Sequence, residues 1–210
     1  MKNLMIVVFL LLFTQGAVAR TMAERVSKIE ASWANTSETK PTTERESAFL
    51  SLVNDISDVV IAFPDQAEPL IIKSTILLTM AKDASSFVAL GLVNQAKTLL
   101  DKAIQIDPEA REGSALVTMG VIYHKTPGWP IAFGDDKEAK NYLLRALKVN
   151  PNGVSSNYYY AAFLLEQGNK EQAASHLTKA VNAKLDPNSP SFKIKQEQQN
   201  QAKLALADLS

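Results

Sequence analysis

The fold is decided by a stretch that reads DDKEAKNYLLRAL (residues 135–147), then Pro151-Asn152-Gly153, then YYYAAFL (residues 158–164), and finally EQAA (residues 171–174) after Gly168. The first and second runs have helical apolar spacing, and the Pro-Asn-Gly sequence separates them. The third run follows the glycine and has the same character. The stretch therefore predicts three helices joined by short turns.

The first helix of this stretch belongs to an internal repeat. Its alanine, leucine, alanine and proline are spaced by four, three and five residues, as Ala139, Leu143, Ala146 and Pro151. The same spacing occurs upstream as Ala96, Leu100, Ala103 and Pro108, and its first part recurs downstream as Ala173, Leu177 and Ala180. Such self-similarity indicates repeated helix pairs that stack on one another.

The repeat length fits antiparallel helix pairs with insertions. Prolines 64, 108, 151 and 187 are 44, 43 and 36 residues apart, and the alanines at 139 and 173 are 34 apart. A period of about 34 residues corresponds to one helix pair with its turns. The clearest insertion is 125–134, where Pro127, Gly128 and Pro130 prevent a continuous helix.

Small residues in the repeat predict where helices cross closely, because only glycine, alanine or serine fits there. These positions are Gly120 and Ala161 in first helices, and Ala139, Ala146, Ala173 and Ala180 in second helices. Apolar spacing predicts further helices over 21–34, 43–63, 67–82, 93–106, 112–124 and 189–208, with no strand. Capping pairs are expected at Thr43/Glu46, Asp65/Glu68, Asp135/Glu138 and Asn169/Gln172. The segment 35–41 reads as a loop, and 84–92 fits either a loop or a helix start.

Residues 1–19 have the pattern of an export signal. Lys2 precedes an unbroken apolar run from Leu4 to Phe13, and Ala17-Val18-Ala19 is a small-x-small cleavage site. The alternative is a membrane anchor, but ten helical residues reach only about half of a ~30 Å hydrocarbon core. We expect a mature protein that is periplasmic or secreted, with no stable membrane insertion after cleavage.

The amino-acid composition argues against several classes of function. The chain has 22 basic and 22 acidic residues, so it offers no electrostatic footprint for nucleic acid or an anionic membrane surface. It has no cysteine and two histidines, His124 and His176, which lack metal-ligand spacing. We interpret His124 as a cation at a helix end and expect His176 on a solvated face. No phosphate-binding glycine loop or nucleophile elbow is present. We expect neither an enzyme nor a cofactor or metal site, and we interpret Asp135 as a helix cap rather than half of a paired acid site.

These motifs resemble the tetratricopeptide repeat. Its first-helix pattern is matched by Leu116, Met119, Gly120 and Tyr123, followed by the second-helix residues 139, 143, 146 and 151. The next unit is matched from Tyr160 to Ala180, and an earlier unit by its second helix, Ala96 to Pro108. The resemblance implies an all-α, helical-hairpin solenoid over 67–187. We then expect N-terminal helices over 20–66 and a C-terminal capping helix over 188–210.

Two further resemblances concern the cellular location of the protein and its association with other proteins. Residues 127–135 and 157–160 are similar to a group of exported bacterial proteins with this repeat. The chain is also similar to the periplasmic T component of tripartite ATP-independent transporters, which implies association with a solute-binding protein.

In tetratricopeptide arrays the first helices line a concave groove. The resemblance places two sets of residues there: Ser114, Val117 and Val121, and Tyr158, Ala162 and Leu165. Helical geometry directs Tyr160 and Leu164 to the core and leaves Tyr158 or Tyr159 more exposed, so that Tyr158 either anchors a peptide or packs. Trp129 and Phe133 in the insertion either contact a ligand or partner, or fill the space between helices.

Two functions are compatible with these features. The first is a scaffold that binds a protein, as a peptide or a partner helix, in the groove. The second is a small-molecule-binding accessory component of a periplasmic transport system. An envelope assembly factor is a third possibility, which differs from the first only in the partner's identity.

Overall fold

The structure is a computed structural model that describes residues 21–38 and 42–209. The chain divides between Asp65 and Gln66 into two compact units. In the described residues every regular element is an α-helix, and the only strand-like pairing is one bridge between Gly128 and Gly134. The all-α prediction is confirmed. The predicted export signal at 1–19 and the side chain of the predicted cap Thr43 lie outside what the structure describes.

The first unit contains a helix over 21–38 and α2 (Thr42–Ala62). Met22, Val26 and Ile29 are buried on one face of the first helix, as their spacing predicts. The expected loop over 35–41 is wrong for 35–38, which continue the helix. The Ser37 hydroxyl donates a hydrogen bond to the Trp33 carbonyl (2.9 Å), so polar side chains that suggested a loop satisfy the helix backbone instead.

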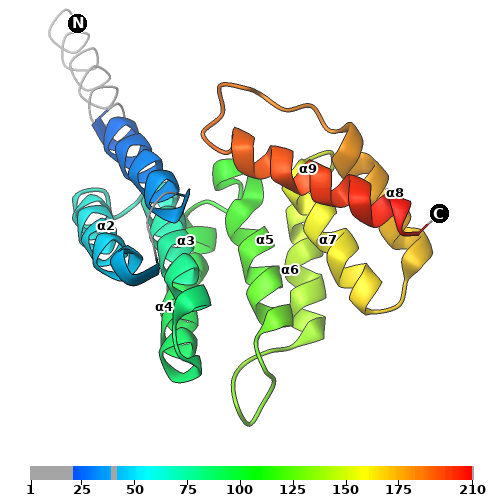
Figure 1. Cartoon of the computed structure of the whole chain (residues 1–210), viewed down its shortest axis with the longest axis horizontal. Helices are drawn as coiled ribbons and strands as arrows, with labels where there is room; N and C mark the ends of the chain where they lie inside the picture. The colour runs from blue at the N-terminus through cyan, green and yellow to red at the C-terminus, as the bar shows by residue number, and fades with distance from the viewer. Residues whose placement is uncertain (1–20, 39–41, 210) are drawn as a thin grey trace, which may run out of the picture. The chain divides into compact units, whose positions relative to one another are not determined.

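The second unit is a succession of helical hairpins (Figure 1). Its helices are α3 (Ala67–Asp83), α4 (Ser86–Ile106), α5 (Ala110–Lys125), α6 (Asp136–Val149), α7 (Val154–Glu166), α8 (Lys170–Asn182) and α9 (Phe192–Ala207). The hairpins are α3/α4, α5/α6 and α7/α8. Each later first helix also packs on the preceding pair: α5 on α3 and α4, and α7 on α5 and α6.

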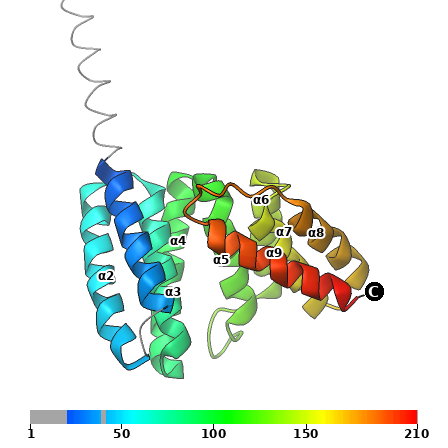
Figure 2. The ribbon, with the colours of Figure 1, turned by 45° about the horizontal axis from the view of Figure 1, so that its top comes forward.

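The helix α9 follows the same packing rule. It contacts α7 and α8, as α7 contacts α5 and α6, and Figures 1 and 2 both show it crossing α7. Ala202 of α9 is fully buried in a cluster with α7 and α8 residues, including Leu164 and Leu177. Thus α9 covers the apolar surface that the last hairpin would otherwise expose.

The small residues of the repeat lie at close helix contacts, as predicted. A β carbon added to Gly120 would lie 2.5 Å from Leu143 Cγ and 3.1 Å from the Ala139 carbonyl oxygen, so α5 and α6 approach each other at this glycine. The repeat alanines are fully buried: Ala96, Ala103, Ala139, Ala146, Ala161, Ala173 and Ala180. Close packing of this kind leaves little space for a larger side chain.

Helix ends account for the remaining differences from the sequence predictions. Asp135 caps α6 by accepting hydrogen bonds from the backbone of Lys137 and Glu138, and Asn169 caps α8. Asp65 does not cap α3, because that helix begins after Gln66, without a side-chain cap. The undecided segment 84–92 is helical from Ser86 onwards. No described helix is long and apolar enough to cross a membrane.

A left-handed turn joins the hairpins near the start of α5. Arg111, Glu112 and Gly113 all have positive φ (50°, 59° and 75°). Arg111 donates to Glu68 at the start of α3 (2.7 Å). Glu112 accepts from Asn150, before α7, and from Lys195 of α9 (2.9 and 2.8 Å). The strained turn therefore directs two charged side chains toward neighbouring hairpins.

Candidate functional site

The relative register of α5 and α7 is fixed by contacts at their C-terminal ends. Glu166 of α7 contacts both His124 and Lys125 of α5, 42 and 41 residues earlier in the chain. These first helices are neighbours in successive hairpins and run in the same direction. A constant offset of about 41 residues therefore relates positions at the same level on the two helices.

This register brings the predicted groove residues together in pairs. Val121 lies level with Ala162, Val117 with Tyr158, and Ser114 with Ser155. Within each set the residues are three or four positions apart, so they form a single stripe along their helix. We call the two stripes the inner face, defined by Ser114, Val117, Val121, Tyr158, Ala162 and Leu165.

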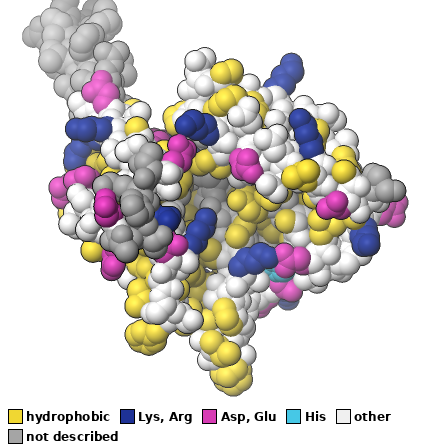
Figure 3. Space-filling view, in the orientation of Figure 1, with side chains coloured by type: hydrophobic (Ala, Val, Ile, Leu, Met, Phe, Trp, Pro, Cys, Tyr) yellow, Lys and Arg dark blue, Asp and Glu magenta, His cyan; other side chains and the backbone are white. Residues whose placement is uncertain are grey.

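The inner face is apolar and incompletely covered. Val117 is buried against Leu116 and Ala146, whereas Tyr158 and Leu165 are half-buried against the α7–α8 core. Val121 and Ala162 also remain partly accessible. Figure 3 shows hydrophobic side chains over the region of α5. Apolar side chains that are not fully covered can bury against a ligand at little polar cost.

Polar groups close one end of the inner face, where α9 passes. The Ser155 hydroxyl donates to Gln198 Oε1 of α9 (2.7 Å). Ser114 Oγ is buried, and the described residues offer it no hydrogen-bond partner. A buried hydroxyl without a partner is costly, so Ser114 is a position where a ligand would gain a hydrogen bond.

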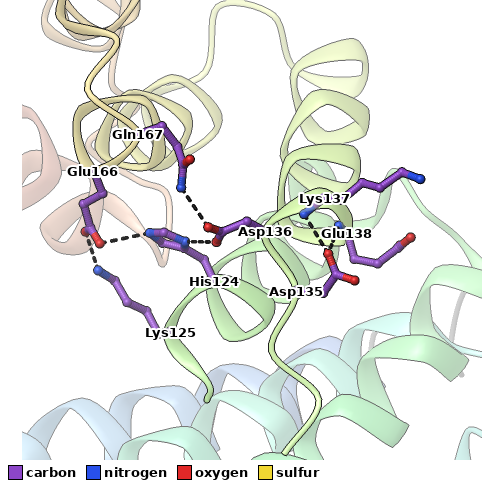
Figure 4. Close-up of polar contacts among 8 residues, drawn as sticks. All are labelled: His124, Lys125, Asp135, Asp136, Lys137, Glu138, Glu166 and Gln167. Atoms are coloured by element: carbon purple, nitrogen blue, oxygen red, sulfur yellow. Dashed lines mark hydrogen bonds and ion pairs between the residues drawn. The ribbon is translucent and has the colours of Figure 1, made fainter. Parts of the chain in front are cut away.

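A charged cluster closes the opposite end (Figure 4). His124 lies between two carboxylates, with Nδ1 2.6 Å from Asp136 Oδ1 and Nε2 3.0 Å from Glu166 Oε2. Lys125 donates to the second oxygen of Glu166, and Gln167 donates to Asp136 Oδ2 (2.8 Å). We call these five residues the His124 cluster; it joins the end of α5 to the start of α6 and the end of α7.

The hydrogen bonds of the His124 cluster favour the ionised form of its two carboxylates. Ionised carboxylates only accept hydrogen bonds, so both contacts are made when His124 carries a proton on each ring nitrogen. The hydrogen bond from His124 lowers the pKa of Asp136 below 3.8. The hydrogen bond from Lys125, and secondarily His124, lowers the pKa of Glu166 below 4.5.

The His124 cluster is suited to holding helices together rather than to catalysis. Both ring nitrogens of His124 are engaged, so neither is available to take a proton from a substrate. The described residues contain no group of three or more His, Asp or Glu side chains able to hold a metal ion. Sequence reasoning placed His124 only as a helix-end cation, and missed the cluster because Asp136 and Glu166 are distant in sequence.

The structure separates the two aromatic residues of the 126–135 loop. Phe133 packs edge-on against Tyr123 (centroids 5.3 Å apart), and the Lys97 ammonium lies 5.9 Å from its ring centre. Trp129 is 89% exposed. The packing interpretation therefore holds for Phe133 and is wrong for Trp129, which fills no space between helices. Neither residue belongs to the inner face.

The tyrosines of α7 have distinct environments. Tyr160 is buried with Leu164, as predicted. Tyr158 and Tyr159 are both half-buried and meet edge-to-face at 5.1 Å. Tyr159 packs toward the α5–α6 cluster, and burial raises its pKa. Tyr158 is thus the tyrosine that the inner face presents.

His176 is not on a solvated face, contrary to the sequence interpretation. Its Nδ1 lies 2.8 Å from Asn157 Oδ1, and its ring meets Tyr160 edge-on. Asn157 is fully buried and donates to the carbonyls of Pro151 and Gly153 (both 2.9 Å). This network fixes the turn before α7, so His176 has a structural role.

Neither models of known protein families nor the curated proteins give a match to this sequence.

Proposed function

We propose that the protein is an exported, tetratricopeptide-like solenoid that binds a partner protein, as a peptide or a helix, on its inner face. The alignment of the α5 and α7 stripes carries this proposal. The successive hairpin packing of α3 to α8 and the repeated small residues support the solenoid. The export pattern of residues 1–19 supports a periplasmic or secreted location.

Affinity on this surface would come mainly from apolar contact. The inner face contains no charged residue. Tyr158 is the natural anchor, because it offers a large apolar ring with a hydroxyl at its tip. Binding should therefore change little between low and moderate salt, and a steep loss would contradict the proposal.

Site-specific photo-crosslinking tests the location of the partner. A photoreactive amino acid is placed at Ala162 on the inner face, or at Thr178, an exposed position of α8, as the matched control. After irradiation in the envelope fraction, we expect a discrete adduct from position 162 that is absent from 178. The Tyr158→Ala variant should lose that adduct. Adducts from 178 alone would place the interface elsewhere.

The buried Ser114 hydroxyl favours a second candidate, a small-molecule-binding accessory component of a periplasmic transport system. A small ligand with one hydrogen-bonding group would satisfy this atom while its apolar part fills the inner face. Native mass spectrometry of the purified protein would then show a retained mass. That mass should disappear in Ser114→Ala, which removes only the hydroxyl.

A further inference from the structure

Large hydrophobic side chains are exposed at two tips of the second unit. Phe87 and Val88, in the first turn of α4, are 89% and 52% exposed. Trp129 and Ile131, in the 126–135 loop, are 89% and 71% exposed. Scattered exposed apolar residues are ordinary, but clusters of large ones mark interaction sites. We call these two pairs the apolar tips.

The apolar tips lie at the same end of the helical stack. The turn after α3 and the loop after α5 each join a first helix to a second helix of a hairpin, and α3 contacts α5. Equivalent turns of hairpins stacked in this way lie at one end. Figure 3 shows hydrophobic side chains at two projections from its lower edge, where Figure 1 places the start of α4 and the loop after α5.

Contacts along α4 show how far the tips project. The Lys97 ammonium lies 5.5 Å from the Tyr123 ring centre and 5.9 Å from that of Phe133, so Lys97 marks the level where the loop leaves the helices. Phe87 precedes Lys97 by ten residues. At about 1.5 Å per residue, α4 continues roughly 15 Å beyond that level. The start of α4 therefore lies beyond the level at which the loop leaves α5.

The loop that presents Trp129 is held in a defined conformation. The Gly134 amide donates to the Pro127 carbonyl, and the Asp135 amide donates to the Tyr123 carbonyl (both 2.9 Å). The Ile131 amide donates to the Gly128 carbonyl (3.1 Å). Phe133 anchors the loop against Tyr123 from the inside. The outward position of Trp129 is thus built into the loop.

We propose that the apolar tips insert into the interfacial region of a lipid bilayer and attach this end of the protein to the membrane surface. Two separate convex projections match a flat, deformable medium, whereas a protein partner would need two matching pockets. Tryptophan favours the boundary between headgroups and acyl chains. The near-balanced charge of the chain favours zwitterionic lipid, with attachment by apolar contact.

This attachment is peripheral and is independent of the inner face. The tips reach into the interface and do not span the bilayer, so they require no long apolar helix. Bound in this way, the protein would keep its inner face free for a partner. Loss of lipid binding would therefore leave binding on the inner face unchanged.

Fluorescence of Trp129 in the full chain tests the proposal directly. The protein has two tryptophans, and Trp33→Phe leaves Trp129 as the only one. Phosphatidylcholine vesicles should shift its emission to shorter wavelength, and brominated acyl chains should quench it, equally at low and high salt. Co-sedimentation alone would be ambiguous, since the apolar run from Leu4 to Phe13 can itself bind lipid. Quenching of Trp129 reports the tip.

Variants at the second tip complete the test. With Phe87→Ser in the Trp33→Phe background, we expect the equilibrium between inserted and free tips to fall about tenfold, because one large side chain no longer leaves water. Leu204→Ser, which alters an exposed leucine of α9, should leave it unchanged. Two results would overturn the proposal: emission unaffected by vesicles, or a shift that follows protein concentration without lipid, which would indicate self-association.

Discussion

Gly120 of α5 faces Leu143 of α6 so closely that a β carbon on the glycine would lie 2.5 Å from Leu143 Cγ. Leu143 is itself buried in the core, with 1% of its surface exposed. The distance between these two helices is thus set by the absence of one side chain. This contact is a direct test of how the hairpin is packed.

We expect Gly120→Ala to lower the free energy of unfolding by about 1–3 kcal/mol, because α5 and α6 must separate to admit the methyl group. Gly91→Ala is the matched control: Gly91 lies within α4, and a β carbon there would meet nothing within 4 Å. That substitution should raise stability by up to about 1 kcal/mol through helix propensity. Urea unfolding measures the free energy of unfolding of both variants. Equal changes in the two variants would contradict a close contact between α5 and α6 at Gly120.

The left-handed turn at the start of α5 contains Gly113, and Gly168 also has a positive φ. We expect alanine to destabilise the protein to different extents at these two positions. Gly113 and Gly168 have positive φ of 75° and 77°, so alanine at either site carries about 1 kcal/mol or more of backbone strain. At Gly113 the added β carbon would also meet Val149 Cγ1 at 3.1 Å, whereas Gly168 has open space. In urea unfolding, Gly113→Ala should therefore lower the free energy of unfolding more than Gly168→Ala does. The reverse order would show that Val149 moves aside at little energetic cost.

The His124 cluster predicts a pH dependence at its two carboxylates. The pKa of Asp136 and of Glu166 is lower in the folded protein than the ordinary 3.8 and 4.5. Their contribution to stability is therefore complete above those values and is lost as pH falls through the lowered folded pKa values. Since both side chains are about half exposed, the contribution is only about 0.5–1 kcal/mol.

Glu166→Gln tests this dependence while keeping the side-chain shape. The variant should be less stable than wild type at pH 6 by that small amount, and the difference should shrink below pH 4. Asp55→Asn, at an exposed position in the interior of α2, is the control. A difference between wild type and Glu166→Gln that stayed constant from pH 6 to pH 3 would refute an ionic role for Glu166.

His176 predicts that stability also depends on pH near pH 6, above the range in which the two carboxylates titrate. Burial, and secondarily the charge of Lys179, lowers its pKa below 6.5. Near pH 6 the unfolded chain therefore binds a proton at His176 more readily than the folded protein does. The stability that His176 contributes is complete above pH 6.5 and is lost as pH falls through 6.5 toward the folded pKa.

His176→Gln removes this titration. The change in unfolding free energy between pH 7.5 and pH 5.5 should be smaller for the variant than for wild type, as measured by urea unfolding at both values. Comparing pH differences cancels the constant cost of altering the contact with Asn157. If the two proteins lost the same amount of stability, proton binding at His176 would not be linked to folding.

The sequence anticipated those features that depend on local spacing. The buried faces and the crossing residues Gly120 and Ala139 follow from helical periodicity and side-chain size. Asp135 was predictable as a cap because the hydrogen bonds of a cap span two or three residues.

Features that depend on contacts distant in sequence were not predictable in the same way. Glu166 meets His124 only because α7 stacks beside α5, and nothing in either local sequence records that neighbour. Polar composition misplaced the end of the first helix, where Ser37 bonds to the helix backbone. The opposite orientations of Trp129 and Phe133 depend on which ring meets Tyr123.

The loop between α5 and α6 leaves the stack at one end and returns with its ends tied by the Gly134–Pro127 and Asp135–Tyr123 hydrogen bonds. Residues added or removed beyond those ties would alter only how far the loop reaches. They would not shift α5 against α7, because that alignment is set by Glu166 with His124 and Lys125. The architecture thus allows the reach of the loop to diverge during evolution independently of how the helices stack.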